Sequence, residues 1–488
     1  MPAVEDPRGL QRLSASPKDT GPGGTVVPGR PGRPFAQAAS QVRFTTLNNG
    51  LRVIVWPDHK IPNVALYHWV HVGSRNEGSG TTGLAHFFEH MMFNGTARHP
   101  QGEFDRLMEA RGGSNNAYTS QDVTVYQDWF PQDALELVLE LEADRFANLA
   151  LVPQVVENER QVVYSERRLR VDDSNAASLE EQVQALAFLA HPYRIPVIGW
   201  PSDILSWSME DLRRFHRTYY APNNRTLVLV GDFAPDATLD LVQRCFGAAP
   251  AGPPPPAVLT SEPEQQGERR LVLPRPGHTP LVQVAYHAIA AADEREPALN
   301  LLQTILLGGD ASRLNRSLVE EQRLAIAIGG GWPQGFDANL FHLQATLPAG
   351  EAPEVFEQAL DAELDRLVQD GVSEQELRRA KNITAADFWR GIATMDGKAR
   401  LIGEYAVMHG DHRRLFNAPE AYESVTCEQV LAVARAVFRA SRRTVGVLQP
   451  LGLASSETQS QREPLPAELG ATYAAEADLA MGLADPRT

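Results

Sequence analysis

The sequence predicts an α+β fold built from two homologous halves, and three observations lead to this expectation. Residues 42–77 are rich in β-branched side chains around an Asn-Gly turn, which predicts three successive strands. Residues 132–151 instead repeat apolar side chains at three-to-four spacing, which predicts a helix. Residues 208–230 align without gaps with residues 426–448, and both segments have the order amphipathic helix, short turn and apolar strand. We therefore expect two repeat domains, each a largely antiparallel β-sheet packed against helices.

Proline-rich composition marks the boundary between the two halves. Residues 251–268 contain a run of four prolines followed by polar residues, which predicts a linker. The first domain then spans residues 41–250 and the second spans residues 269–450. Residues 1–40 mix prolines with charges and predict a disordered leader, whereas residues 451–488 are rich in Ala, Glu and Ser and predict a flexible tail.

The composition is that of a globular protein and excludes one class of partner. With 488 residues, 43% of them hydrophobic, the chain is long enough to need more than one core. The net charge of −16 argues against nucleic acid as a partner, because phosphate backbones are bound by clustered Lys and Arg. Cys245 and Cys427 lie in different halves without CxxC spacing, so we expect neither a disulfide framework nor a cysteine-based zinc site.

The hydropathy pattern gives no signal for membrane insertion. The sequence contains no apolar run of roughly 18 residues, so we expect no membrane-spanning helix. Charges and prolines near the start interrupt the continuous apolar segment that a secretory signal requires. The sequence as it stands predicts a cytoplasmic protein, and a periplasmic location stays open if the start is misassigned.

Residues 83–96, "GLAHFFEHMMFNGT", place polar groups on one face of an apolar helix. Residues three and four apart share a helix face, so His86, Glu89 and His90 point the same way. Two imidazoles at this spacing can bind one Zn²⁺ while the glutamate reaches an attacking water, which is the outline of a hydrolytic centre. Burial in a core is the alternative, but each polar group would then need its own partner.

The third protein ligand cannot be chosen from spacing alone. A catalytic zinc takes three protein ligands and leaves one position for water. In "VENERQVVYSERR", Glu159 and Glu166 are seven residues apart and share a helix face. A solvated charged face is the alternative interpretation of this helix.

The second half lacks the polar face. Under the shift that aligns the repeats, Thr304, Leu307 and Gly308 take the places of the two histidines and the glutamate. We therefore expect one metal ion per chain, bound by the first domain.

The sequence resembles the pitrilysin-type zinc metallopeptidases of family M16, the inverzincins, whose HxxEH order reverses the usual zincin motif. It is similar in particular to bacterial two-repeat members related to mitochondrial processing peptidase. The resemblance covers about residues 41–450 and is carried by "GLAHFFEHMMFNGT", "GGSNNAYTSQDVTVYQ", "ENERQVVYSE", "YYAPNNRTLVLVGDF" and "LLGGDASRLNRSLVEE". It implies that the two domains form half of a clam-shell chamber.

The resemblance also implies roles for individual residues. It makes His86, His90 and Glu166 the zinc ligands and Glu89 the general base. Glu159 matches an acid that orients a ligand histidine. Asn116 and Ala117 fall on an edge strand that would pair with an extended peptide substrate.

The second half departs from the family pattern at two positions. Where members commonly have an Arg and a Tyr seven residues apart, this chain has Val319 and Ile326, and neither side chain can donate a hydrogen bond. Loss of such a donor typically costs about 10²–10³ in rate. The resemblance therefore implies a zinc endopeptidase that acts on peptides or unfolded segments. It also implies that the enzyme is active as a heterodimer with a related subunit that lacks HxxEH but supplies the Arg/Tyr pair.

Two other functions stay open at this point. A structural or assembly subunit of an M16-like complex would have no need for the intact metal motif. A homodimeric processing peptidase would need the Arg and Tyr that Val319 and Ile326 replace.

Overall fold

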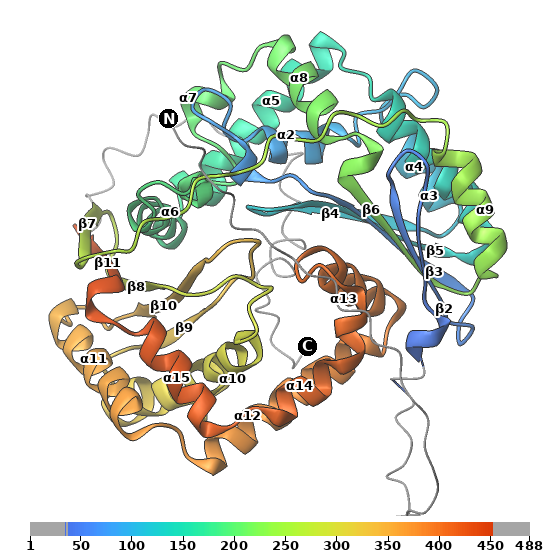
Figure 1. The fold of residues 1–488 in the computed structure, drawn as a ribbon. Coiled ribbons are helices and arrows are strands. Elements are labelled where there is room, and N and C mark those ends of the chain that lie inside the picture. The colour runs from blue at the N-terminus through green and yellow to red at the C-terminus, as the bar shows by residue number, and fades with distance from the viewer. Residues whose placement is uncertain (1–34, 36–37, 452–488) are drawn as a thin grey trace, which may run out of the picture.

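The computed structural model describes residue 35 and residues 38–451, and it contains two β-sheets with helices packed around them (Figure 1). The first sheet has six strands in the order β1 (Arg43–Thr46), β2 (Arg52–Pro57), β6 (Arg225–Gly231), β3 (Asn63–Val70), β5 (Thr124–Pro131), β4 (Ser114–Thr119). The second has five strands in the order β7 (Arg269–Arg275), β11 (Arg443–Pro450), β8 (Leu281–His287), β10 (Leu340–Thr346), β9 (Ala327–Gly331). One pair in each sheet is parallel, β2 with β6 and β7 with β11, and the other pairs are antiparallel.

Helices occupy most of the chain between the strands. Those of the first half are α2 (Leu84–Met91), α3 (Glu103–Ala110), α4 (Leu135–Asn148), α5 (Pro153–Arg167), α6 (Asn175–Ala187), α7 (Pro201–Ile204), α8 (Met209–Tyr219) and α9 (Pro235–Phe246). Those of the second half are α10 (Glu296–Leu307), α11 (Pro353–Asp370), α12 (Glu374–Ile392), α13 (Met395–Val407), α14 (Ala418–Ser424) and α15 (Cys427–Val437). No helix among the described residues is long and apolar enough to cross a bilayer.

The internal repeat seen in the sequence is present in the structure. Helix α8 and strand β6 in the first half correspond to helix α15 and strand β11 in the second. Each of these strands has one parallel and one antiparallel neighbour: β6 lies between β2 and β3, and β11 lies between β7 and β8. The predicted α+β architecture with two related sheet-and-helix units is confirmed.

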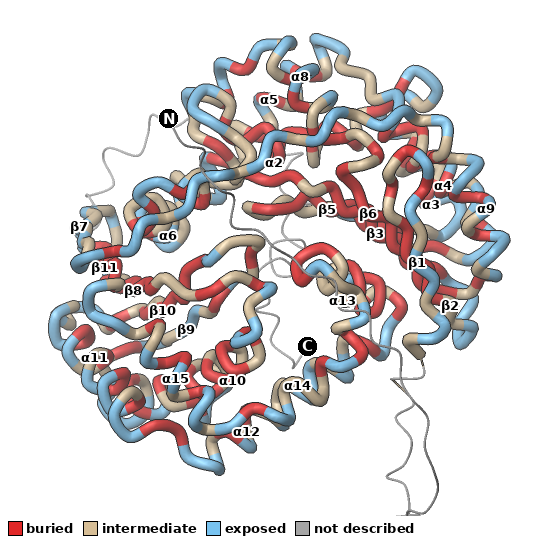
Figure 2. Tube along the Cα trace, in the orientation of Figure 1, coloured by how far each residue is buried: buried red, intermediate tan, exposed pale blue. Residues whose placement is uncertain are grey.

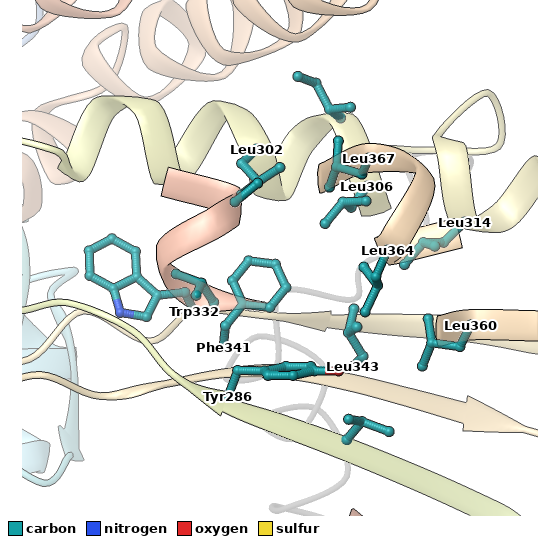
Figure 3. Packing of buried hydrophobic residues seen from close by; sticks show 14 of the residues in the cluster. Tyr286, Leu302, Leu306, Leu314, Trp332, Phe341, Leu343, Leu360, Leu364 and Leu367 are labelled. Carbon is teal, nitrogen blue, oxygen red and sulfur yellow. The ribbon is translucent and has the colours of Figure 1, made fainter. Parts of the chain in front are cut away.

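Strand composition explains why the sheets are buried. Every residue of β6 is buried, and the strand is a nearly continuous apolar run, as expected for a strand covered on both faces. Figure 2 shows the same burial in the centres of β3, β5 and β6, with exposed residues gathered on the outer helices. In the second half, helices α10, α11 and α15 pack on the sheet, and Figure 3 shows Trp332, Phe341 and Tyr286 among the side chains of that core.

The two halves exchange one helix each. Helix α13 comes from the second half but packs on the first sheet, where Met395 and Ile402 join Tyr67 and Trp69 in one buried cluster. The approach is close, since a Cβ on Gly403 would lie 2.3 Å from Nε1 of Trp69. A side chain at this position would therefore push the helix away from the sheet.

Helix α6 makes the reciprocal contact. It comes from the first half, and its residues Leu179 and Val183 pack with Ala285 and Leu448 of the second sheet. A Cβ on Gly446 would lie 2.4 Å from Val183. The exchange of α6 and α13 is visible in Figure 1, where each lies beside the sheet of the other half.

The segment that joins the halves is anchored at two points. Glu262 accepts hydrogen bonds from the backbone N–H groups of Leu189, Ala190 and His191. Gln265 is buried and donates to the carbonyl of Arg443 over 2.8 Å. Most of the predicted leader, residues 1–34 with 36–37, and the tail from residue 452 lie outside the described residues.

Candidate metal centre and active site

Helix α2, which carries the HxxEH motif, begins at a glycine and is fixed there by a glutamate. Gly83 has a φ of 87°, and a Cβ at this position would lie 2.6 Å from the carbonyl oxygen of Ile198. The Glu77 carboxylate accepts hydrogen bonds from the backbone N–H groups of Gly83 and Ala85, each over 2.6 Å. The first N–H groups of a helix have no partners within the helix. Burial raises the pKa of the Glu77 carboxyl well above its ordinary value, although the hydrogen bonds from Ala85 and Gly83 act to lower it. Glu77 thus holds the turn that carries His86.

Three side chains from two helices converge on one point. Nε2 of His86 lies 3.5 Å from Oε2 of Glu166, and Nε2 of His90 lies 3.3 Å from the same oxygen. Among the described residues, His86, His90 and Glu166 are the one group of His, Cys, Asp or Glu residues whose ligand atoms lie close enough to hold a metal, all within 4.8 Å of one another. The structure therefore brings together the three residues predicted to be ligands.

Glu159 lies behind His90. Its Oε1 is 2.8 Å from Nδ1 of His90, and its Oε2 accepts a hydrogen bond from the Asn94 amide over 2.9 Å. With Nδ1 of His90 turned to this carboxylate, Nε2 faces Glu166 and is the atom available to a metal ion. This is the arrangement that fixes the orientation of a metal-ligating histidine.

The electrostatics of the cluster favour a positive charge at its centre. Burial opposes protonation of His90, but the carboxylates of Glu159 and Glu166 raise its pKa to about 10. Burial also opposes ionisation of Glu166, but the two histidines and Arg170 lower the pKa of that carboxyl to about 2. Burial lowers the pKa of His86. Without a metal, a proton on His90 supplies the positive charge that the carboxylates stabilise.

The three groups fit zinc. Ligand atoms at about 2.0–2.1 Å around a tetrahedral ion lie roughly 3.3–3.5 Å apart, which is the spacing between Glu166 and the two histidines. Oε2 of Glu166 and Nδ1 of His86 are buried and make no hydrogen bond in the described part of the chain. A buried carboxylate oxygen without a hydrogen-bond donor is expected where a cation is to be bound.

Glu89 lies on the same face of α2 and reaches the end of strand β4. Oγ1 of Thr119 donates a hydrogen bond to Oε2 of Glu89 over 2.5 Å. Strand β4 is the last strand of its sheet and pairs only with β5 in the described structure. Its outer edge therefore presents backbone N–H and C=O groups beside the metal cluster, and such an edge can accept an extended peptide.

The predicted substrate residues Asn116 and Ala117 lie in the middle of this edge strand. Both line a hollow of 740 Å³ that also contains His86, Glu89 and His90. The side-chain oxygen of Asn116 accepts from the N–H of Ala117 over 2.8 Å. The structure thus places the predicted substrate strand and the metal cluster in one cavity.

The hollow has walls from both halves. Asn339 and His342 of the second half line it, together with Glu180 of helix α6. Burial raises the pKa of the Glu180 carboxyl. No motif marks Glu180 or Glu77 as functional in the sequence. Thr119 follows the predicted substrate residue Ala117 by two positions, and this proximity is the signal that could have identified it.

The two positions that depart from the family pattern lie away from this cavity. Val319 is partly buried and packs against the core of the second half, and Ile326 is 57% exposed just before β9. Neither residue is among those that line the hollow around the histidines.

Family models match both halves of the chain. Residues 52–199 match the insulinase model of peptidase family M16, and residues 206–384 match the model of the M16 inactive domain. Zinc protease PqqE of Helicobacter pylori is 32% identical over 416 residues, covering 83% of this chain and 92% of that protein. The chain belongs to peptidase family M16. An uncharacterized zinc protease of Mycobacterium bovis, Mb2805c, is 30% identical and is matched over 87% of this chain and 97% of its own length.

Solved structures of M16 proteins share the fold. A protease from Helicobacter pylori superimposes with a TM-score of 0.81 at 30% identity, covering 84% of this chain and 99% of that one. A peptidase M16 inactive domain from Pseudomonas fluorescens gives a TM-score of 0.78 at 18% identity, covering 87% of this chain and all of that one (100%). A protein described as a protease and one named for an inactive domain thus share this architecture, so activity depends on the residues of the site.

Proposed function

We propose that this M16 chain is a zinc-dependent endopeptidase that cleaves peptides or unfolded polypeptide segments. The observation that carries the proposal is the convergence of His86, His90 and Glu166 in the same hollow as Glu89 and the edge strand β4, whose outer edge has no partner among the described residues. A protein that retained the fold for assembly alone would need neither the three-ligand cluster nor the acid beside it.

Each residue has a role that follows from its position. One zinc ion held by His86, His90 and Glu166 would activate a water molecule and polarise the peptide carbonyl. Glu89 would take the proton of the attacking water and pass it to the leaving amine. Glu159 would keep His90 oriented through the 2.8 Å contact with Nδ1.

The substrate would bind as an added strand. The outer edge of β4, at Asn116 and Ala117, would pair with the backbone of an extended peptide, so that recognition depends on chain conformation as much as on side chains. A segment whose backbone is already paired within a folded protein cannot pair with β4 in this way. Short peptides and unfolded regions are therefore the favoured substrates.

We propose further that the active form is a heterodimer with a related M16 subunit. This chain carries the metal cluster, but its residues Val319 and Ile326 offer no hydrogen-bond donor and lie away from the hollow. A second chain without HxxEH, but with Arg and Tyr at these positions, would supply donors for the substrate backbone and the oxyanion. One relative, a probable mitochondrial-processing peptidase subunit β from Arabidopsis thaliana, is 28% identical over 271 residues, and its name describes one subunit of a larger enzyme.

The test is cleavage of an unstructured fluorogenic peptide of about 20 residues by the purified chain, with and without the candidate partner. We expect cleavage that a chelator abolishes, that added zinc restores and that Glu89→Gln eliminates while zinc stays bound. Glu140→Gln, an exposed glutamate of α4, is the matched control and should leave the rate unchanged.

Three outcomes separate the possibilities. Cleavage that requires the partner supports a shared active site. Chelator-sensitive cleavage by this chain alone keeps the zinc peptidase and rejects the heterodimer. No cleavage by either preparation, with zinc bound, rejects the peptidase in favour of a structural or assembly role.

A further inference from the structure

A second hollow touches the same edge strand as the metal cluster. Residues 116–119 of β4 line the catalytic hollow. A separate hollow of 480 Å³ is lined by Ser114 at the other end of the strand and by Gly112 just before it. No metal ligand or acid of the catalytic cluster lines this second hollow. We refer to it as the distal hollow.

The distal hollow has an apolar lining to which both halves contribute. Ile61, Trp129 and Phe130 come from the first half, and Met395 comes from the start of α13. Ile61 is 50% exposed, although burying a side chain of this size is normally favourable. The hollow therefore presents apolar surface to solvent at the end of the substrate strand.

Two carboxylates that line the distal hollow, Asp58 and Asp396, already have partners. Nε1 of Trp129 donates to Oδ1 of Asp396 over 2.5 Å, and the Tyr67 hydroxyl donates to the same carboxylate. Asp58 forms an ion pair with Lys398. Since these carboxylates already have partners, the hollow offers a ligand its apolar and aromatic surface beside the exposed Lys60.

The direction of the strand determines which part of a substrate would reach this hollow. Strand β4 runs from Ser114 to Thr119, and Thr119 contacts Glu89. A peptide added in the antiparallel sense, the slightly more stable arrangement, runs the opposite way. Residues on the carboxyl side of the scissile bond then extend toward Ser114. At about 3.4 Å per residue, the five steps between Thr119 and Ser114 span about 17 Å.

We propose that the distal hollow is a substrate subsite that binds an apolar side chain three to five residues beyond the scissile bond on its carboxyl side. The inference rests on the proposed peptidase function and adds a substrate class to it, namely extended peptides with a large aliphatic or aromatic residue at that distance. Successive side chains of a strand point to opposite faces, so only every second position can enter the hollow.

The first test moves one phenylalanine along an otherwise Ser/Gly/Ala peptide, from the second to the sixth residue beyond a fixed cleavage site. We expect kcat/KM to alternate with a period of two and to peak about 10-fold above the peptide without phenylalanine, the gain expected from burying most of an aromatic side chain. A profile that is flat across all positions overturns the proposal.

The second test uses a variant of the hollow. Ile61→Asp should remove the peak, so that peptides with and without phenylalanine at the preferred position are cleaved at similar rates. Leu205→Asp is the matched control, because Leu205 is similarly exposed (51%) and lines neither hollow. Retention of the full peak in Ile61→Asp overturns the assignment of the site, and thermal melts of both variants show that they are folded.

Binding separates this proposal from the peptidase function. The zinc-loaded Glu89→Gln chain should bind fluorescein-labelled versions of the same peptides, with a dissociation constant that alternates in the same way. Alternating affinity without cleavage by the unaltered chain keeps the subsite and rejects the peptidase. Affinity that does not depend on the position of phenylalanine rejects the subsite whether or not cleavage occurs.

Discussion

Thr119 donates a hydrogen bond to Oε2 of Glu89 over 2.5 Å, and this contact joins the proposed substrate strand to the proposed general base. Thr119 is the last residue of β4, so a peptide that pairs with this strand lies against the residue that orients Glu89. Binding of a substrate and orientation of the acid are thereby linked through one side chain.

Replacement of Thr119 should lower the rate of the chemical step more than it changes substrate affinity. Thr119→Val keeps the shape but removes the donor, and a hydrogen bond to a charged group is worth about 1.5–3 kcal/mol. We expect kcat to fall about 10-fold or more, with zinc content and KM nearly unchanged. Steady-state kinetics with metal analysis measures this.

Thr119→Ser is the control for the Thr119 prediction. Serine retains the hydroxyl and should recover most of kcat. If valine and serine give the same kcat, the hydrogen bond has no part in orienting Glu89.

Glu77 should control how tightly the first turn of α2 holds the metal. Its carboxylate accepts from Gly83 and Ala85, and Glu77→Gln leaves only one acceptor for these two N–H groups. We expect zinc to bind about 10-fold more weakly, because one hydrogen bond that holds the start of the helix is lost. Competition with a chromophoric chelator measures the affinity. Glu109→Gln, at an exposed position of α3, should leave it unchanged, and equal affinities in both variants would contradict the role of Glu77.

Glu180 should favour substrates with a basic residue near the scissile bond. It lines the catalytic hollow, and no described residue forms an ion pair with it. A lysine or arginine of a peptide would supply the missing positive charge. We expect Glu180→Gln to lower kcat/KM several-fold for a peptide with arginine beside the cleaved bond and to leave the matched alanine peptide unaffected. An equal loss for both peptides would show that Glu180 only shapes the hollow.

The sequence grouped the residues of the proposed metal cluster because they lie close together along two helices. Two ligands and the acid lie within one helical turn of α2, and Glu159 and Glu166 lie two turns apart on α5, so periodicity alone places each set on one face. Spacing could not bring α5 against α2, and only the resemblance selected Glu166 before the structure placed it.

Contacts between distant segments could not be predicted in this way. The linker was visible as a proline-rich run, but nothing in the composition indicates that α6 packs on the second sheet or α13 on the first. Glu77 is six residues from Gly83, and nothing in the sequence distinguishes it from a glutamate on the surface. Its hydrogen bonds to the start of α2 could therefore not be predicted. The distal hollow depends on Met395 meeting Ile61 and Trp129, three residues from separate parts of the chain.

Glu296 should make the stability of the protein depend on pH. Burial raises the pKa of this carboxyl to about 7, although Tyr422 donates a hydrogen bond to it. The folded state therefore keeps a proton that the unfolded state releases near pH 4.5, and this contribution to stability is lost as the pH rises from about 4.5 to 7. We expect Glu296→Gln to reduce the loss of stability between pH 5 and pH 8 by about 2 kcal/mol, measured by urea unfolding. Glu294→Gln, two residues earlier and exposed, should keep the original pH dependence, and identical curves for all three proteins would contradict the assignment.

The exchange of helices predicts that one small side chain affects the whole molecule. A Cβ on Gly403 would lie 2.3 Å from the indole of Trp69, so Gly403→Ala should separate α13 from the first sheet. Overpacking of this kind typically costs about 1–3 kcal/mol. Because α13 belongs to the second half and Trp69 to the first, we expect calorimetry to show one transition shifted to lower temperature. Gly329→Ala, where a Cβ would meet nothing within 4 Å, should leave the transition in place. Two separate transitions in Gly403→Ala, with only one of them shifted, would show that the halves fold independently despite the exchange.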